Sequence, residues 1–215
     1  MFFSQRLKVL ILSLLLAANH LLVISQNFEG SIIYKMNMKY NNISNRSLIY
    51  RKVLIKDNNY LSEMYIDKME ADSYTLRIDK NIYFINDLSG IITKDISKRN
   101  ELYPNFKKSK KKVTLLGYNC TVYHGIRNTR WGKDTTYLSV ADSLFTNIEK
   151  SPFVYDGRVI LRSYQLIEGG YVLREAVEIK KKELEDYLFE LPNYPIEKKD
   201  MSKLTQQYLK KAEQK

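Results

Sequence analysis

The chain has 215 residues, and its 35 Lys and Arg residues outnumber its 24 Asp and Glu residues, giving a formal net charge of +11. This balance favours anionic surfaces, but the sequence contains no nucleic-acid-binding motif, so we expect no nucleic-acid partner. The length suits one sizeable hydrophobic core, and the single cysteine, Cys120, excludes an internal disulfide.

The first 25 residues have the pattern of an export signal. Two basic residues precede the apolar run 9–18, and Val23-Ile24-Ser25 fits the small-residue rule for signal peptidase, with cleavage between Ser25 and Gln26. The alternative is an uncleaved anchor, although the apolar run is shorter than the roughly 20 residues of a membrane span. Because Gln26 stands where a lipoprotein needs cysteine, we expect a periplasmic or secreted protein that is not a lipoprotein and has no stable membrane span after cleavage.

Alternation of apolar and polar residues with a period of two predicts strands through most of the remaining chain. The clearest case is 27–40, where Phe28, Ile32 and Tyr34 alternate with more polar positions. Further strands are expected at 48–56, 60–67, 73–79, 81–86, 91–96, 113–125, 133–141, 158–167 and 171–180. No helical pattern long enough for a parallel crossover separates them, so we predict a mainly β fold, a single curved antiparallel sheet or half-barrel of about ten strands.

Three segments interrupt or follow this pattern. The lysines of Lys107-Lys108-Ser109-Lys110-Lys111-Lys112 predict contact with an anionic surface, and the alternative is a solvated loop. Residues Asp142 to Ile148 predict a short helix or turn capped by Asp142. A short C-terminal helix, capped by Asp200 or Ser202, is expected to cover one face of the sheet or to fray. The expected organisation is a signal peptide at 1–25, an antiparallel β domain at 26–199 and a helix or tail at 200–215.

The sequence offers little material for catalysis or metal binding. Cys120 and His124 lie four residues apart on a predicted strand, so both point to one face, but two ligands do not make a metal site. A Cys-His hydrolase is disfavoured because the surrounding sequence lacks the expected glycines and helix start. Cys120 is either a small buried hydrophobe or a thiol that pairs with another chain. We therefore predict no catalytic residues, no metal, no cofactor and no enzyme activity.

The 17 tyrosines form an aromatic surplus that falls largely on predicted strands. Tyrosine suits half-buried pleated surfaces, so strand composition is one explanation. The other is an aromatic-lined concave face that takes up an acyl chain or an extended peptide. In the second case Tyr34, Met36 and Met38 are predicted to line the ligand, since Met adapts to irregular shapes.

Several short motifs resemble a known family. The segments Phe28-Glu29-Gly30-Ser31-Ile32-Ile33-Tyr34, Leu116-Gly117-Tyr118-Asn119-Cys120 and Leu188-Phe189-Glu190-Leu191-Pro192-Asn193-Tyr194 resemble the secreted GLPGLI-type proteins of Gram-negative bacteria, whose function is unknown. The Gly-Leu-Pro-Gly-Leu-Ile segment itself is absent, and Asp156-Gly157-Arg158-Val159-Ile160-Leu161 occupies that region. More remotely, the resemblance implies the lipoprotein-carrier architecture, an antiparallel half-barrel whose hollow is closed by helices and accepts acyl chains.

These observations predict a non-enzymatic periplasmic binding protein whose concave sheet takes an apolar ligand, a lipid or an acyl chain. The alternative is an accessory or structural subunit that binds a cell-envelope protein complex through a sheet edge or the basic segment.

Overall fold

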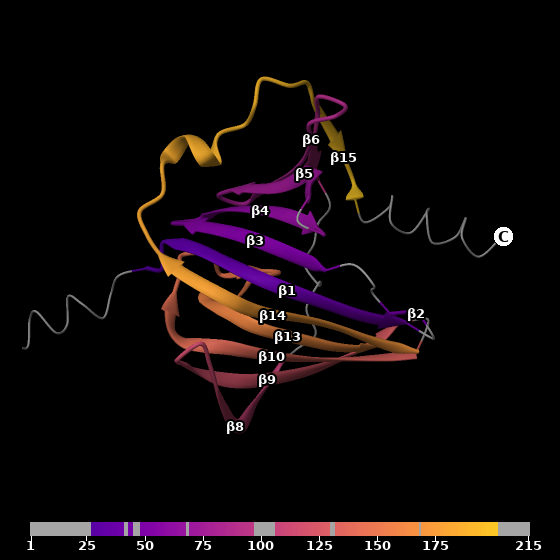
Figure 1. Cartoon of the computed structure of the whole chain (residues 1–215), viewed down its shortest axis with the longest axis vertical. Coiled ribbons are helices and arrows are strands. Elements are labelled where there is room, and N and C mark those ends of the chain that lie inside the picture. Colours follow the sequence, from indigo (N-terminus) through magenta and orange to yellow (C-terminus); the bar gives the residue numbers. More distant parts are fainter. Residues whose placement is uncertain are drawn as a thin grey trace, which may run out of the picture.

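The computed structural model describes residues 27–40, 43–44, 48–67, 69–96, 106–129, 132–167 and 169–201. Within these residues fifteen strands form one hydrogen-bonded sheet, accompanied by the short 3-10 helix η1 (Asp186–Phe189). Figure 1 shows the strands as one curved layer. The predicted β class and single curved sheet are confirmed, whereas the prediction of about ten strands was too low. The signal at 1–25, its cleavage site at Ser25 and Gln26, and the predicted helix beyond Met201 lie outside the described residues.

The sheet consists of two meanders joined through β1 (Gly30–Tyr40). One meander contains β3 (Ile49–Lys56), β4 (Asn59–Ile66), β5 (Met69–Ile78), β6 (Asn81–Asn86) and β7 (Ile91–Asp95), with β15 (Ile196–Lys199) at its edge. The other contains β14 (Gly170–Lys181), β13 (Arg158–Ile167), β10 (Gly132–Phe145), β9 (Tyr118–Thr129) and the edge strand β8 (Lys107–Leu115). Three two-residue strands lie beside this path: β2 (Ile43–Ser44), β11 (Lys150–Ser151) and β12 (Val154–Tyr155).

The expected antiparallel pairing holds throughout the described sheet except at one edge, where β15 runs parallel to β7. The exception arises from the long connection after β14. Figure 1 shows this C-terminal segment leaving the middle of the sheet, passing through η1 and reaching the far edge. A connection of that length can bring a strand to an edge in either direction, whereas the short hairpins elsewhere enforce antiparallel neighbours.

Two sequence-based predictions of local structure were wrong. The predicted strand at 113–125 is a hairpin of β8 and β9, because Leu116 and Gly117 both adopt positive φ, 50° and 80°, as a two-residue turn requires. The lysine segment, for which a solvated loop was the alternative, therefore belongs to an edge strand, and its contact with an anionic surface stays a prediction. The predicted helix or turn beginning at Asp142 is also absent, since β10 continues to Phe145.

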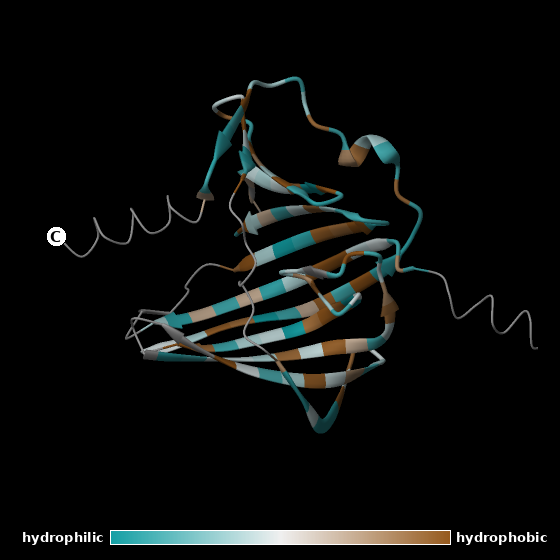
Figure 2. Ribbon diagram, turned by 180° about the vertical axis from the view of Figure 1, so that it is seen from behind, coloured by the Kyte–Doolittle hydropathy of each residue, from teal (hydrophilic) through white to brown (hydrophobic). Residues whose placement is uncertain are grey.

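Buried hydrophobic residues form clusters on both faces of the sheet. We call these faces the Tyr34 face and the Leu54 face. In the pairing of β1 with β3, Tyr34 lies opposite Arg51 and Ser31 lies opposite Leu54, so Tyr34 and Leu54 point to opposite faces. On the Tyr34 face, buried residues of the central strands pack against segment 146–157, with Phe153 only 1% exposed. Figure 2 shows hydrophobic residues gathered at one end of the long central strands, while their other ends are more hydrophilic.

The second core explains the position of the C-terminal segment. Leu184 and Phe189 are buried on the Leu54 face, in one cluster with Leu54, Leu61 and Leu76. Lys56 fixes the segment further, because its Nζ donates to the Leu184 carbonyl at 2.6 Å. This connection thus covers the first meander.

Among the residues that the structure describes, no helix is long and apolar enough to cross a membrane.

Candidate functional site

The second meander carries a hollow of about 450 Å³ on the Leu54 face, which we call the Tyr164 cavity. Its floor is built by strand register. His124, Tyr137, Tyr164 and Leu173 lie directly opposite one another across β9, β10, β13 and β14, so their side chains share one face. The next row toward the buried end is Val122, Ser139, Arg162 and Glu175. Both rows line the cavity.

Three aromatic rings of the cavity lining form a continuous wall, and a fourth ring, that of Tyr171, extends this wall beyond the lining. The ring centroids of His124 and Tyr137 are 6.4 Å apart, those of Tyr137 and Tyr164 are 6.4 Å apart, and Tyr171 follows at 5.7 Å from Tyr164. Tyr137 is 41% exposed, so the wall faces solvent. The arrangement presents apolar ring surface beside hydroxyl groups, which suits a ligand with apolar and polar parts.

The charged residues of the Tyr164 cavity are partly neutralised. Arg162 Nε donates to Glu175 Oε2, and both side chains are about one-third exposed. Lys111, on the edge strand β8, reaches the rim together with Ser109. Of the five lysines predicted to contact an anionic surface, Lys111 is therefore the one that the structure brings to this cavity.

A second hollow of about 370 Å³ lies on the Tyr34 face of the first meander, and we call it the Arg51 cavity. Register again builds it, since Ser62 pairs with Thr75, Thr75 with Phe84 and Phe84 with Thr93 across β4 to β7. Arg51 pairs with Met64 in the neighbouring row. The described lining contains hydroxyls, one amide, apolar side chains and two cations, but no carboxylate.

Arg51 is the unusual residue of this cavity. Its Nη1 donates to Ser62 Oγ at 3.3 Å and its Nη2 lies 3.8 Å from Met64 Sδ, while Nε is buried without a hydrogen-bond partner in the part of the chain that the structure describes. Burial lowers the pKa of Arg51, and the positive charge of Arg174 lowers that pKa further. No described carboxylate forms an ion pair with it.

The residues predicted to line a ligand occupy three different environments along β1. Tyr34 is fully buried in the core of its face, and its hydroxyl donates to the Ile160 carbonyl at 2.8 Å. Burial raises the pKa of this phenol above its usual range. Met36 is half-buried, whereas Met38 is 46% exposed. None of the three lines either described cavity, and their role in ligand binding stays a prediction.

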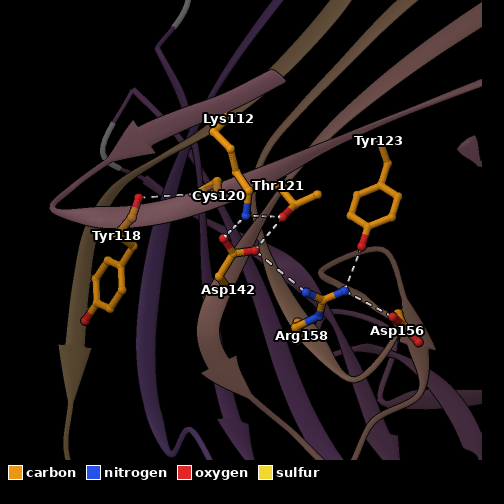
Figure 3. A network of polar contacts seen from close by, with 8 residues as sticks. All are labelled: Lys112, Tyr118, Cys120, Thr121, Tyr123, Asp142, Asp156 and Arg158. Carbon is orange, nitrogen blue, oxygen red and sulfur yellow. Dashed lines mark hydrogen bonds and ion pairs between the residues drawn. The ribbon is translucent and has the colours of Figure 1, made fainter. Parts of the chain in front are cut away.

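The lysine-rich strand is tied to the sheet by a polar network that the sequence did not indicate (Figure 3). Lys112 Nζ lies 2.5 Å from Asp142 Oδ2, and the Thr121 hydroxyl donates to Asp142 Oδ1 at 2.6 Å. Arg158 joins the network 3.7 Å from Asp142 and donates to the Tyr123 hydroxyl at 2.7 Å. Lys112 thus holds an internal ion pair, which leaves Lys107, Lys108, Lys110 and Lys111 as the lysines of the segment for an outside contact.

Cys120 and His124 do not form a common site. Cys120 is fully buried, its Sγ donates to the Tyr118 carbonyl at 3.4 Å, and burial raises the pKa of its thiol to about 11. His124 instead stacks on Tyr137 in the Tyr164 cavity. Among the residues that the structure describes, no group of three or more His, Cys, Asp or Glu side chains could hold a metal ion.

Sequence reasoning missed both cavities because neither is local in sequence. Arg51, Ser62, Thr75 and Thr93 come from four strands and are brought together by pairing alone. One signal was available in the sequence. Arg51 lies two residues before the buried Val53 and four before the buried Ile55, so on a strand its charged side chain points to the same inward face.

Comparison with known proteins gives information on the fold only. No protein-family model matches the sequence, and no curated protein matches it. The fold is similar to part of PNGF-II, with a TM-score of 0.52 and 17% identity over 82% of this chain. This chain spans only 32% of the PNGF-II chain. At this identity the similarity concerns the fold and not the activity.

Two further similarities are weaker. LprF from Mycobacterium bovis has a TM-score of 0.33 and 10% identity, over 77% of this chain and 89% of its own. A domain provisionally described as an outer membrane lipoprotein-sorting protein, from Vibrio parahaemolyticus, has a TM-score of 0.38 and 14% identity, over 75% of this chain and 89% of its own. The resemblance to GLPGLI-type proteins and to the lipoprotein-carrier architecture stays a prediction.

Proposed function

We propose that this chain is an exported, non-enzymatic binding protein that takes the apolar part of a ligand, such as an acyl chain, in the Tyr164 cavity. The observation that carries the proposal is the row of rings from His124 through Tyr137 to Tyr164 and Tyr171 on a solvent-facing side of the sheet. Val113, Val122 and Leu173 add aliphatic surface to the same hollow.

Burial energetics favour an occupant for such a surface. An aromatic wall left in water forgoes the free energy that apolar contact provides, about 25 cal/mol for each Å² covered. The C-terminal segment covers the Leu54 face over the first meander, but its buried residues cluster with β3 to β7 and not with the Tyr164 cavity. The volume of about 450 Å³ falls within the ~300–1,000 Å³ of small-ligand pockets.

Native mass spectrometry of protein purified from the periplasm of a Gram-negative host tests the proposal. We expect an additional mass that belongs to a lipid or another acyl compound. Titration with a neutral long-chain alcohol that carries a fluorophore supplies an affinity. Absence of both a bound mass and saturable alcohol binding would overturn the proposal.

A pair of tyrosine substitutions localises the binding. Tyr164→Asn removes ring surface from the middle of the cavity, and covering roughly 50 Å² less apolar surface weakens binding about tenfold. Tyr187→Asn is the matched control, because Tyr187 lies on η1 outside the cavity and is 66% exposed. Equal affinities for the two variants would place the ligand elsewhere.

The alternative function is binding of a cell-envelope protein through a sheet edge or the basic segment, and its first form, pairing with a sheet edge, meets a structural objection. Both edges of the described sheet are rich in lysine, β8 over Lys107–Leu115 and β15 over Ile196–Lys199. The register of β8 also shifts between Lys108 and Lys112, which marks a bulge. Lysines and bulges at an edge oppose the addition of another strand, so we expect the edges to keep the chain from self-association.

A further inference from the structure

We propose that the Arg51 cavity is a second, separate binding site, which holds an oxyanion, a carboxylate or a phosphate, through the Arg51 guanidinium. The cavity lies on the Tyr34 face of the first meander, whereas the Tyr164 cavity lies on the Leu54 face of the second. The two sites share no lining residue, so this inference does not depend on the proposed function.

Arg51 carries a charge that its surroundings do not compensate. The residue is half-buried and its Nε is fully buried, and withdrawing part of a guanidinium from water is costly unless a charged or strongly polar partner repays the lost hydration. Among the described residues its partners, Ser62 Oγ and Met64 Sδ, are neutral, and its Nε has no hydrogen-bond partner. Arg174 adds a second positive charge nearby. A buried polar group left in this state requires an explanation, and an anionic ligand provides one.

The composition of the cavity wall also suits an anion. The other cation of the described lining, Lys199, already forms an ion pair with Glu197, so Arg51 is the cation available to a ligand. The remaining polar lining consists of residues with hydroxyl and amide groups, which can donate hydrogen bonds to an oxyanion: Ser62, Ser73, Tyr74, Thr75, Asn86, Ser89 and Thr93. A lining without carboxylates avoids repulsion of the anion.

The guanidinium group of Arg51 is chemically suited to an oxyanion. Its planar fork matches carboxylate and phosphate oxygens, and such charge-assisted hydrogen bonds are the strong ones in proteins. Met64, Phe84 and Ile91 flank the polar groups and offer apolar contact to the remainder of a larger ligand. The cavity therefore fits a free oxyanion as well as the anionic head of an amphiphile.

Thermal unfolding of the whole mature chain at pH 7 tests the inference with three sodium salts, phosphate, acetate and octanoate, each compared with chloride at equal ionic strength. We expect at least one oxyanion to raise the Tm in a saturable way that chloride does not reproduce. A stronger response to octanoate than to acetate identifies an amphiphile, and a response to phosphate alone identifies a free phosphate group. Equal responses to all four salts would overturn the inference.

Three variants distinguish a ligand-binding role of Arg51 from a purely structural role. Arg51→Gln abolishes the oxyanion response while leaving the Tm in chloride unchanged or higher, because it removes the uncompensated charge. Arg51→Lys keeps the charge but loses the fork, so its affinity falls about tenfold. Arg77→Gln removes one positive charge outside the cavity and keeps the full response.

The opposite pattern contradicts the inference. If Arg51 serves only in packing, Arg51→Gln has a lower Tm in chloride than the parent chain and the same response to the oxyanion salts. Binding of the neutral alcohol probe in the Tyr164 cavity is measured on the same variants. In Arg51→Gln, loss of the oxyanion response with retained alcohol binding shows that the two sites are separate. Loss of alcohol binding with a retained oxyanion response contradicts the Arg51 site and places the alcohol next to Arg51.

Discussion

Replacing Phe153 by alanine is the sharpest test of how segment 146–157 is held on the Tyr34 face. The ring is 1% exposed, and its centroid lies 5.8 Å from that of Tyr34 and 5.5 Å from that of Tyr60. The guanidinium of Arg174 stands over the same ring at 4.8 Å. One side chain therefore joins the segment to β1, β4 and β14.

The expected loss follows from these contacts. Truncating a fully buried phenylalanine to alanine costs about 3–5 kcal/mol through lost burial and the cavity left behind. With a urea m-value of about 2 kcal/mol per M, the unfolding midpoint falls by about 1.5–2.5 M. Phe153→Leu keeps most of the apolar volume and loses mainly the ring geometry, so its cost is about 1–2 kcal/mol.

Urea unfolding followed by circular dichroism measures both variants. Leu88→Ala is the control, since Leu88 is 79% exposed and its truncation changes stability by less than about 0.5 kcal/mol. Hydrogen exchange gives a second readout, in which the amides of segment 146–157 lose protection in Phe153→Ala. If Phe153→Ala unfolds at the same urea concentration as Leu88→Ala, the segment is not anchored by this ring and the reasoning is refuted.

Three further predictions concern single residues. Gly30→Ala lowers the free energy of unfolding by several kcal/mol, because φ of Gly30 is 151° and an added Cβ would lie 2.1 Å from the Lys180 carbonyl oxygen. Gly117→Ala costs only about 1–2 kcal/mol, since nothing lies within 4 Å of a Cβ added there. Urea unfolding compares the two variants, and equal losses of stability would contradict the clash at Gly30. Burial opposes ionisation of Asp142, but hydrogen bonds from Lys112 and Thr121 outweigh it and hold the pKa of Asp142 below its usual range. The stability that the ionised Asp142 contributes is therefore present above about pH 4 and is lost as the pH falls through its folded-state pKa. Asp142→Asn is expected to flatten the acid side of a curve of unfolding free energy against pH, and an unchanged slope would argue against the ion pair. Cys120, with a buried thiol whose pKa is about 11, stays unreactive toward a thiol-specific disulfide reagent at pH 8 until urea unfolds the chain, and rapid native labelling would point to an exposed thiol.

The alternating pattern predicted the strands well where the turns between them have strong local signals. The pair predicted at 158–167 and 171–180 matches β13 and β14, because the Gly169-Gly170 pair between them is a strong local signal for a hairpin turn. The β8–β9 turn was missed because its first residue is Leu116, an apolar side chain that rarely adopts φ of +50°. A leucine in that position looks like one more strand residue.

The lysine segment illustrates a second kind of limit. Charge alone suggested a loop or an anionic contact, but the strand β8 tolerates these residues because it has a neighbour on only one side. Which strand is an edge depends on the order of strands in the sheet. That order is a property of the whole chain and is invisible in any short window.

The sequence by itself determined the β class, the positions of most strands and the scarcity of catalytic groups, because these depend on side-chain period and composition. Only the tertiary structure decided which rows meet across the strands, and with them the Tyr164 cavity and the Arg51 cavity. Strand pairing brings together residues far apart along the chain, and a one-residue change in register would turn each of them to the opposite face. The charge of Arg51 follows from the sequence, but only the assembled sheet shows that its partners among the described residues are neutral and that its Nε has none.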